Sequence, residues 1–203
     1  MKVLVTGSRG QLARALADAA GAHGAQLIAL GRPHLDLARP RTVSDALAHE
    51  QPDIVINAAA VTHVDRAESD PEFAFAVNAA GAAAVARACD ARGLPLIHLS
   101  TDYVFDGRKD APFTETDAPS PLNAYGASKL AGERAVAQHC RNHLIVRTSW
   151  LYSAFGSNFV KTMLTLAASK VEIPVVEDQH GNPTSAHHLA DVLLGIATRL
   201  LGD

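Results

Sequence analysis

Cysteine is scarce in this sequence, which has Cys89 and Cys140 among its 203 residues. Small secreted domains that depend on disulfides contain many more cysteines, so a disulfide scaffold is excluded. Both cysteines fall in alanine-rich stretches with a helical pattern. We therefore expect two reduced thiols inside the core.

An excess of charge of one sign is also lacking, because the formal net charge is -3. Without a basic stripe, the sequence does not favour a nucleic-acid partner. No apolar stretch reaches the length of a membrane span, and the apolar start is too short for a signal peptide. We therefore expect a cytoplasmic protein with no membrane and no nucleic-acid partner. A hydrophobic content of 48% suffices for one main core.

Short apolar runs alternate with helical patterns along the whole chain. This alternation is typical of an α/β protein with a Rossmann-type doubly wound parallel sheet and helices on both faces. The long polar segment 102–120 is expected to cover the site. The expected strands are Lys2–Thr6, Gln26–Leu30, Asp53–Asn57, Pro95–Ser100, His143–Thr148 and Ile173–Val176. The expected helices are Gln11–Ala22, Thr42–Glu50, Glu72–Arg92, Leu122–Cys140, Asn158–Ser169 and Ala186–Leu201, with Pro71 and Pro121 suited to helix starts.

The first expected strand runs directly into a glycine turn and then into a helix. Gly7 permits the tight turn, Gly10 lets backbone N–H groups approach a pyrophosphate, and Ala13 allows close packing of helix and sheet. The amino terminus of the helix favours the charge of the phosphate. A Gly-x-x-Gly sequence alone can be an ordinary turn, but its place after the first strand predicts a nucleotide site that includes Gln11 and Leu12.

Tyr125 and Lys129 lie one helical turn apart, so both side chains are expected on one face of a helix. A free tyrosine has a pKa of about 10, and a cation beside it favours the phenolate and lowers that pKa. The pair is thus a candidate proton donor to a carbonyl oxygen. Most such pairs on exposed helices have no chemical role, so this interpretation depends on the other motifs.

A third motif lies at the carboxyl end of the fourth expected strand, where Thr101 and Asp102 follow an apolar run. Ligands bind at this edge of a parallel sheet. Together with Asn57-Ala58-Ala59-Ala60 and the two motifs above, this run resembles the extended short-chain dehydrogenase/reductase superfamily. Within it the chain is similar to the dTDP-4-dehydrorhamnose reductase family at five further runs, namely Val64–Glu68, Ser120–Asn123, Lys129–Glu133, Arg147–Trp150 and Asp178–Thr184.

The resemblance implies NAD(P)H-dependent reduction of the 4-keto group of dTDP-4-dehydro-L-rhamnose to dTDP-L-rhamnose. By the same resemblance, Tyr125 supplies the proton, Lys129 holds the nicotinamide ribose and lowers the pKa of Tyr125, and Thr101 hydrogen-bonds the carbonyl. Core packing is the alternative role for Trp150, and helix capping is the alternative for Asn158. The implied contacts of a dTDP-sugar substrate are Thr101, Asp102, Trp150 and Asn158.

Cofactor choice is expected at the end of the second strand, which reads Leu30-Gly31-Arg32 without an acid. An acid there holds the ribose of NAD, whereas a basic residue accepts the extra phosphate of NADP. Arg32 therefore favours NADPH, with NADH as the alternative; an exposed arginine without a partner is the other interpretation. By resemblance, the remaining cofactor contacts are Asp36, Leu37, Ala58, Ala59, Ala60 and Thr62, in addition to Tyr125 and Lys129.

Members of the family normally continue into a substrate-binding lobe, whereas this sequence stops at Gly202-Asp203. We therefore expect one NADP-binding domain over 1–203, in which 150–203 contributes the start of the substrate-binding region and the lobe is short or missing. The resemblance also suggests a homodimer that pairs through the helices expected at 72–92 and 122–140.

No catalytic metal is expected, although ten histidines are present. His187 and His188 are adjacent and would point about 100 degrees apart on a helix, so they do not form a chelating face. Whether an acidic metal site forms at a dimer interface, as the resemblance could imply, stays open. Ala15 occupies the place of one of its acids.

Three alternatives stay open. A sugar-nucleotide dehydratase or epimerase shares the fold, but dehydratases carry Thr-Asp-Glu where this chain has Thr101-Asp102-Tyr103. A noncatalytic regulatory subunit or a plain NADP-binding module would bind the cofactor without turnover. The presence of Thr101, Tyr125 and Lys129 together favours the reductase.

Overall fold

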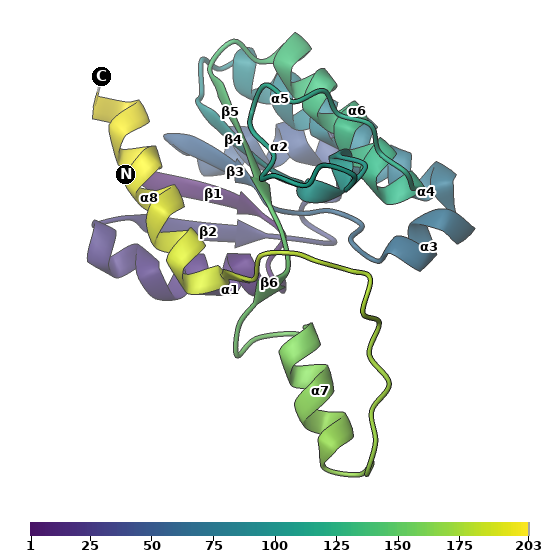
Figure 1. The fold of residues 1–203 in the computed structure, drawn as a ribbon. Coiled ribbons are helices and arrows are strands. Elements are labelled where there is room, and N and C mark those ends of the chain that lie inside the picture. The colour runs from purple at the N-terminus through teal and green to yellow at the C-terminus, as the bar shows by residue number, and fades with distance from the viewer. Residues whose placement is uncertain (203) are drawn as a thin grey trace.

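The computed structural model describes residues 1–202 and has a five-stranded parallel sheet at its centre (Figure 1). The strand order is β2-β1-β3-β4-β5, so β2 and β3 lie on opposite sides of β1. Ligands of such sheets bind beyond the carboxyl ends of the strands at this switch point. The α/β fold class expected from the sequence is confirmed. The strands are β1 Lys2–Thr6, β2 Gln26–Leu30, β3 Ile54–Asn57, β4 Leu96–Thr101 and β5 His143–Thr148.

Helices cover both faces of this sheet (Figure 1). One face packs against α1 Gln11–Ala19 and α8 Ala186–Gly202, with Val3 and Val5 of β1 in its core. Leu4 faces the other core, because successive residues of a strand point to opposite faces. That second face is covered by α2 Pro40–Glu50, α5 Ala82–Asp90 and α6 Ala124–His139. The remaining helical segments are η1 Ala20–His23, α3 Val64–Ser69, α4 Pro71–Phe75, η2 Ala76–Gly81, η3 Asp102–Val104 and α7 Phe159–Ala167.

The start of α6 is set by a side-chain cap. The helix begins at Ala124, two residues after the expected Leu122, and the Oδ1 atom of Asn123 accepts the backbone N–H of Gly126 at 2.8 Å. Such a side-chain oxygen supplies a partner for one of the N–H groups that the first turn leaves unpaired. Pro71, by contrast, begins α4 as expected.

The helix expected at 72–92 is helical from Pro71 to Asp90, but it is not one regular α-helix. Its middle part, η2, has π-helical geometry and separates α4 from α5. The alanine-rich sequence does not reveal this change of helix type. A short π-helical segment is often found at functional sites.

The strand expected at Ile173–Val176 is wrong, because in the described chain this run has no regular secondary structure and joins neither sheet. Pro174 has no N–H to donate to a ladder, and the two valines that follow it are more than half exposed. A small second sheet forms elsewhere, where β6 Leu151–Tyr152 pairs in parallel with β7 Thr184–Ser185.

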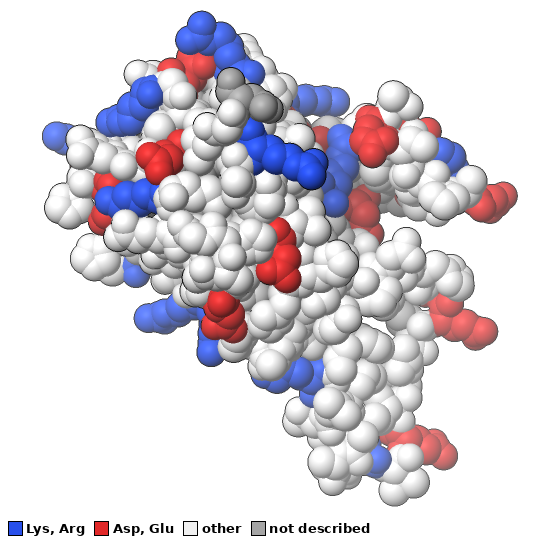
Figure 2. Space-filling model, turned by 90° about the vertical axis from the view of Figure 1, so that its left-hand side faces the viewer, with Lys and Arg blue, Asp and Glu red and all other residues white. Residues whose placement is uncertain are grey.

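The helix α7 and the extended chain 170–183 project from the body of the molecule (Figure 1). All residues of α7 are at least partly exposed. Charged side chains of both signs are scattered over the face of the molecule shown in Figure 2. Across residues 1–202, no helix combines the length and the apolar character needed to cross a membrane.

Candidate active site

A cleft of about 930 Å³ opens at the carboxyl edge of the main sheet. Its walls are the turns after β1, β2 and β3 and the residues at the ends of β4 and β5. This volume falls in the range of about 300–1,000 Å³ that is usual for small-molecule and cofactor sites. Among the predicted site residues, those that line the cleft are Gly7, Gly10, Gln11, Leu12, Arg32, Asp36, Leu37, Ala58, Ala59, Ala60, Thr62, Thr101, Asp102, Tyr125, Lys129 and Trp150.

The glycine turn after β1 is shaped for close approach of a ligand. Gly7 has a φ of 90°, a conformation that favours glycine, and a Cβ there would lie 3.4 Å from the Cβ of Ala59. Gly10 precedes α1, and a Cβ at this position would meet no described atom within 4 Å. Within residues 1–202, no side chain caps this helix and no acid lies in its first turn. Its N–H groups and the positive end of the helix dipole can therefore receive a phosphate.

A buried polar network fixes the turn after β3. The hydroxyl of Thr6 donates to Oδ1 of Asn57 at 2.6 Å and accepts the N–H of Ala59 at 3.0 Å. The side-chain amide of Asn57 bonds to Nδ1 of His98 at 2.9 Å. Burial holds the pKa of His98 well below its usual value, and the charge of Lys129 lowers it further. A neutral His98 can therefore accept this hydrogen bond, which holds the alanine turn against the cleft.

Asn78, which lies in η2, connects the same turn to the helix that carries Tyr125. Its side chain accepts the N–H of Val61 at 2.8 Å and donates to the carbonyl of Val61 at 3.0 Å. It also donates to Oγ of Ser128 at 2.9 Å, and that hydroxyl donates to the carbonyl of Tyr125 at 2.7 Å. Our sequence interpretation missed Thr6, His98 and Asn78. The available signal was a polar side chain inside an otherwise apolar buried run.

Tyr125 is buried next to the end of β4. Burial raises the pKa of its hydroxyl, a hydrogen bond with Thr101 lowers it, and the neighbouring carboxylate of Asp102 raises it further. The hydroxyl of Thr101 also lies 3.1 Å from Oδ1 of Asp102. Burial likewise raises the pKa of the Asp102 carboxyl group. The residues predicted to face a substrate carbonyl therefore lie together at the end of β4.

The pKa of Tyr125 is raised here, whereas its spacing from Lys129 predicted a lowered one. The ammonium group of Lys129 is buried and donates to the carbonyl of Leu99 at 2.6 Å. Burial lowers the pKa of Lys129 from 10.5 to about 8, and Glu133 opposes this effect. The net result at Tyr125 is a raised pKa, because loss of solvent at the phenol outweighs the favourable contacts.

Trp150 follows β5 and lines the cleft, and the residue is 39% exposed. Its φ of 45° is uncommon for a bulky residue, and such backbone conformations are often found at ligand sites. Its carbonyl accepts the N–H of Thr184 at 3.2 Å, and its ring lies 6.0 Å from that of Phe159. This half-exposed position excludes the alternative in which Trp150 packs in the core.

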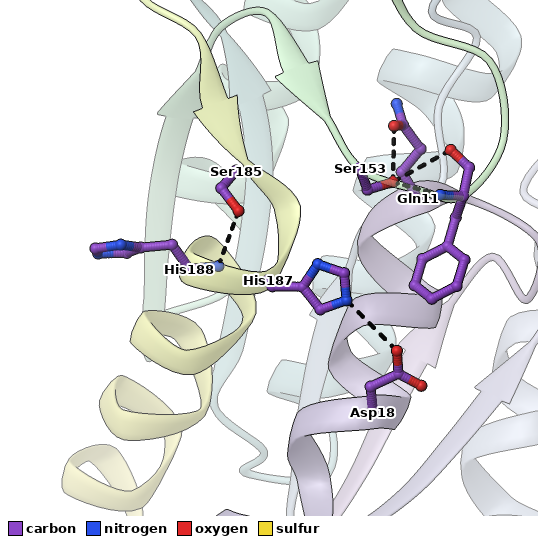
Figure 3. A network of polar contacts seen from close by, with 7 residues as sticks. Gln11, Asp18, Ser153, Ser185, His187 and His188 are labelled. Carbon is purple, nitrogen blue, oxygen red and sulfur yellow. Dashed lines mark hydrogen bonds and ion pairs between the residues drawn. The ribbon is translucent and has the colours of Figure 1, made fainter. Parts of the chain in front are cut away.

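Asn158 is outside the lining of the cleft. Its side chain caps α7 by accepting the N–H of Lys161 at 3.1 Å and donates to Oε1 of Gln11 at 2.9 Å. Ser153 donates to the same oxygen at 2.9 Å, as Figure 3 shows. The side chain of Gln11 therefore ties α1 to the chain before α7, and capping accounts for Asn158.

The adjacent histidines at the start of α8 point in different directions (Figure 3). Nε2 of His187 lies 3.4 Å from Oδ2 of Asp18 on α1, whereas the ring of His188 points away from this pair. In the part of the chain that the structure describes, no three His, Cys, Asp or Glu side chains gather closely enough to hold a metal ion.

The sequence profile of the RmlD substrate binding domain family matches residues 1–203. A dTDP-4-dehydrorhamnose reductase of Sinorhizobium fredii is 50% identical over 201 residues, which cover 99% of this chain and 68% of that protein. A protein of the same name from Escherichia coli is 52% identical over 156 residues, which cover 77% of this chain and 52% of that protein. This chain thus spans between half and about two thirds of these relatives.

A solved structure shows the same fold. The dTDP-4-dehydrorhamnose reductase of Bacillus anthracis, in complex with NADP, superposes with a TM-score of 0.94 at 38% sequence identity. The superposition covers 98% of this chain and 71% of the Bacillus anthracis chain. The part of that enzyme beyond the match has no counterpart in the described residues.

Proposed function

Since this chain belongs to the dTDP-4-dehydrorhamnose reductase family, whose RmlD profile matches it throughout, we propose that it reduces the 4-keto group of a dTDP-deoxysugar with NADPH. The product would be dTDP-L-rhamnose. The observation that carries this proposal is one cleft that unites the glycine turn with Thr101, Tyr125 and Lys129. Because the chain spans only part of its relatives, the activity of the whole enzyme is proposed for it and not assumed.

The cleft residues suit the binding of a dinucleotide. The uncapped start of α1 would receive the pyrophosphate, and the alanine turn fixed by Thr6 and Asn78 would lie along the nicotinamide side. Asp36 and Leu37 line the end of the cleft where the adenine is expected. When bound, the reduced nicotinamide supplies a hydride to the carbonyl carbon of the sugar.

The protein residues would provide and control the proton. Tyr125 keeps its proton at neutral pH, because its pKa is raised, and can donate it to the carbonyl oxygen. The hydroxyl of Thr101 is placed to hydrogen-bond the same oxygen, and Lys129 would hold the ribose. Trp150 offers an exposed ring face for the sugar or the base. Asn158 would act indirectly, through its bonds to Gln11.

The proposal predicts NADPH oxidation when the purified chain receives dTDP-4-dehydro-L-rhamnose generated in situ. Absorbance follows the turnover, and quenching of protein fluorescence follows cofactor binding independently. Sugar-dependent oxidation supports the reductase. NADPH binding without turnover would instead favour the noncatalytic, cofactor-binding alternative. Absence of both binding and turnover in a folded protein would contradict the proposal.

Arg32 provides a second prediction, about cofactor choice. It is exposed and lines the cleft after β2, where the extra phosphate of NADPH would lie. Arg32→Gln should raise the KM for NADPH by about 10- to 100-fold, as expected for loss of a charge-assisted hydrogen bond, and should leave the KM for NADH nearly unchanged.

The control for this variant is Arg41→Gln. Arg41 is an exposed arginine of α2 that lines a different groove. Steady-state kinetics with both cofactors separate a specific effect from a general loss of positive charge. Equal KM increases for NADPH and NADH in Arg32→Gln would contradict the assignment.

Two broader expectations also remain proposals. One is a cytoplasmic location. The other is a homodimer that pairs through α5 and α6, which carry many small alanine side chains.

A further inference from the structure

A partly buried ion pair joins α6 to β5 beside the site. Oε1 of Glu133 accepts Nε of Arg147 at 2.9 Å, and Oε2 accepts Nη2 at 2.6 Å. The Glu133 side chain is 6% exposed and that of Arg147 is 25% exposed. Two parallel bonds between a guanidinium and a carboxylate fix the relative orientation of the groups as well as their distance. The pair therefore sets how α6 sits against the fifth strand.

Glu133 lies one helical turn after Lys129, so the two residues share a face of α6. The ammonium of Lys129 is held at the carbonyl of Leu99, and Glu133 is the acid whose charge favours its protonated form. The other titratable groups near it are Tyr125 on the same helix and His98 on β4. His98 is kept neutral by burial. Burial has the largest effect on the pKa of Lys129, and Glu133 is the charged group that opposes it.

The other side of Arg147 contacts the long loop that follows the end of β4. Its guanidinium lies 4.9 Å from the centre of the Phe105 ring, and Phe105 stacks on Phe113 at 4.2 Å. Phe105 comes directly after η3, the segment that begins at Asp102. One guanidinium therefore contacts both the helix with Tyr125 and the loop after Asp102.

We propose that Glu133 and Arg147 are positioning residues of this site, which together fix the charge and the location of the Lys129 ammonium. The role in catalysis rests on the proposed reductase function. The carboxylate would stabilise the ammonium, and the guanidinium would limit this effect by neutralising most of the carboxylate charge. Removal of one partner should therefore change the proton affinity of Lys129 in one direction, and removal of the other in the opposite direction.

The test measures the protonation of Lys129 directly, by NMR of lysine side chains labelled with carbon-13 in the complete chain. Lys129→Met identifies the signal by its disappearance. Glu133→Gln should shift the titration of Lys129 downward by about one pH unit or more, because the acid whose charge raises the pKa of Lys129 is lost while the partly buried Arg147 cation stays. Arg147→Met should shift it upward by a similar amount, because the freed carboxylate faces the ammonium. The double variant should titrate near the original value.

Arg141→Met is the matched control. Arg141 pairs with Asp90 at 3.2 Å, but it is 90% exposed and lies outside the site. Its replacement should leave the Lys129 titration unchanged. Shifts of the same sign in Glu133→Gln and Arg147→Met, or no shift in either, would overturn the proposal, since a merely structural role predicts no opposite pair of shifts. If one single variant fails to fold, the sign of the shift in the other single variant, measured against the unshifted double variant, still tests the proposal.

Turnover adds an independent measurement. Ribose binding by a protonated Lys129 should be lost as pH rises through its pKa of about 8, so the alkaline limb of kcat/KM should move to lower pH in Glu133→Gln and to higher pH in Arg147→Met. Opposite NMR shifts in a chain that shows no turnover would uphold the charge control and reject the reductase function. Turnover without these NMR shifts would uphold the reductase and reject the positioning role.

Discussion

Tyr125→Phe should lower kcat by about 100- to 10,000-fold, the range expected when a positioned proton donor is removed. The substitution deletes the phenol hydroxyl that is buried beside Thr101 at the end of β4. The phenyl ring keeps the apolar contacts, including the edge-to-face packing against Tyr103 at 5.6 Å. Binding of NADPH should therefore stay within about threefold of the original value, since a bound cofactor does not need this proton.

The matched control is Tyr152→Phe, which removes a tyrosine hydroxyl from β6 outside the cleft. Its turnover should equal that of the original chain. Steady-state NADPH oxidation measures both variants, and fluorescence titration measures cofactor affinity. Retention of more than about a tenth of the original kcat in Tyr125→Phe would rule out Tyr125 as the proton donor.

Gly132→Ala should reduce the free energy of unfolding by about 3 kcal/mol or more, at the upper end of the usual cost of overpacking. Gly132 lies on α6 where this helix crosses η2, and a Cβ there would lie 2.2 Å from the backbone carbonyl oxygen of Asn78. A backbone atom cannot rotate away as a flexible side chain can. Relief of the clash therefore requires a shift of η2, which also moves the amide that holds Val61 and Ser128.

Gly195→Ala provides the control within another helix. Gly195 lies in α8, and a Cβ at this position would contact no atom of residues 1–202 within 4 Å. This variant should gain up to about 1 kcal/mol, because alanine has the higher helix propensity. Urea denaturation followed by circular dichroism measures both changes. Similar stabilities for the two variants would show that α6 and η2 can separate at little cost.

The sequence predicted the parts of the structure in which local pattern and burial agree. The three central strands of the main sheet are apolar runs buried almost throughout, and the edge strands β2 and β5 are mostly half-buried. Each of the five was recognised within one residue of its observed bounds. The glycine turn was also recognisable, because Gly7 and Gly10 occur immediately after the first strand. Since the ends of parallel strands share one edge, the motifs could be expected to meet there.

The features that the sequence did not predict depend on contacts between segments far apart in the chain. The valines after Pro174 resemble a strand, but no strand lies beside them in the described structure. The π-helical form of η2 and the bonds of Asn78 depend on segments near Val61 and Ser128, which no local pattern specifies. The raised pKa of Tyr125 could not be predicted from a local pattern either. Burial by the fold outweighs the effect that its spacing from Lys129 suggests.

The projecting α7 and chain 170–183 divide the molecule into units of unequal local stability. Amide protons of the main sheet are buried between two layers of helices, whereas those of the projection are backed by side chains that all remain partly exposed. Trp150 stands at the boundary between the two units. The end of the cleft lined by Trp150, Gly156 and Ser157 borders on this projection, so it can open locally while the end lined by the glycine turn stays ordered. Exchange of one sugar nucleotide for the next would then require no unfolding of the cofactor side.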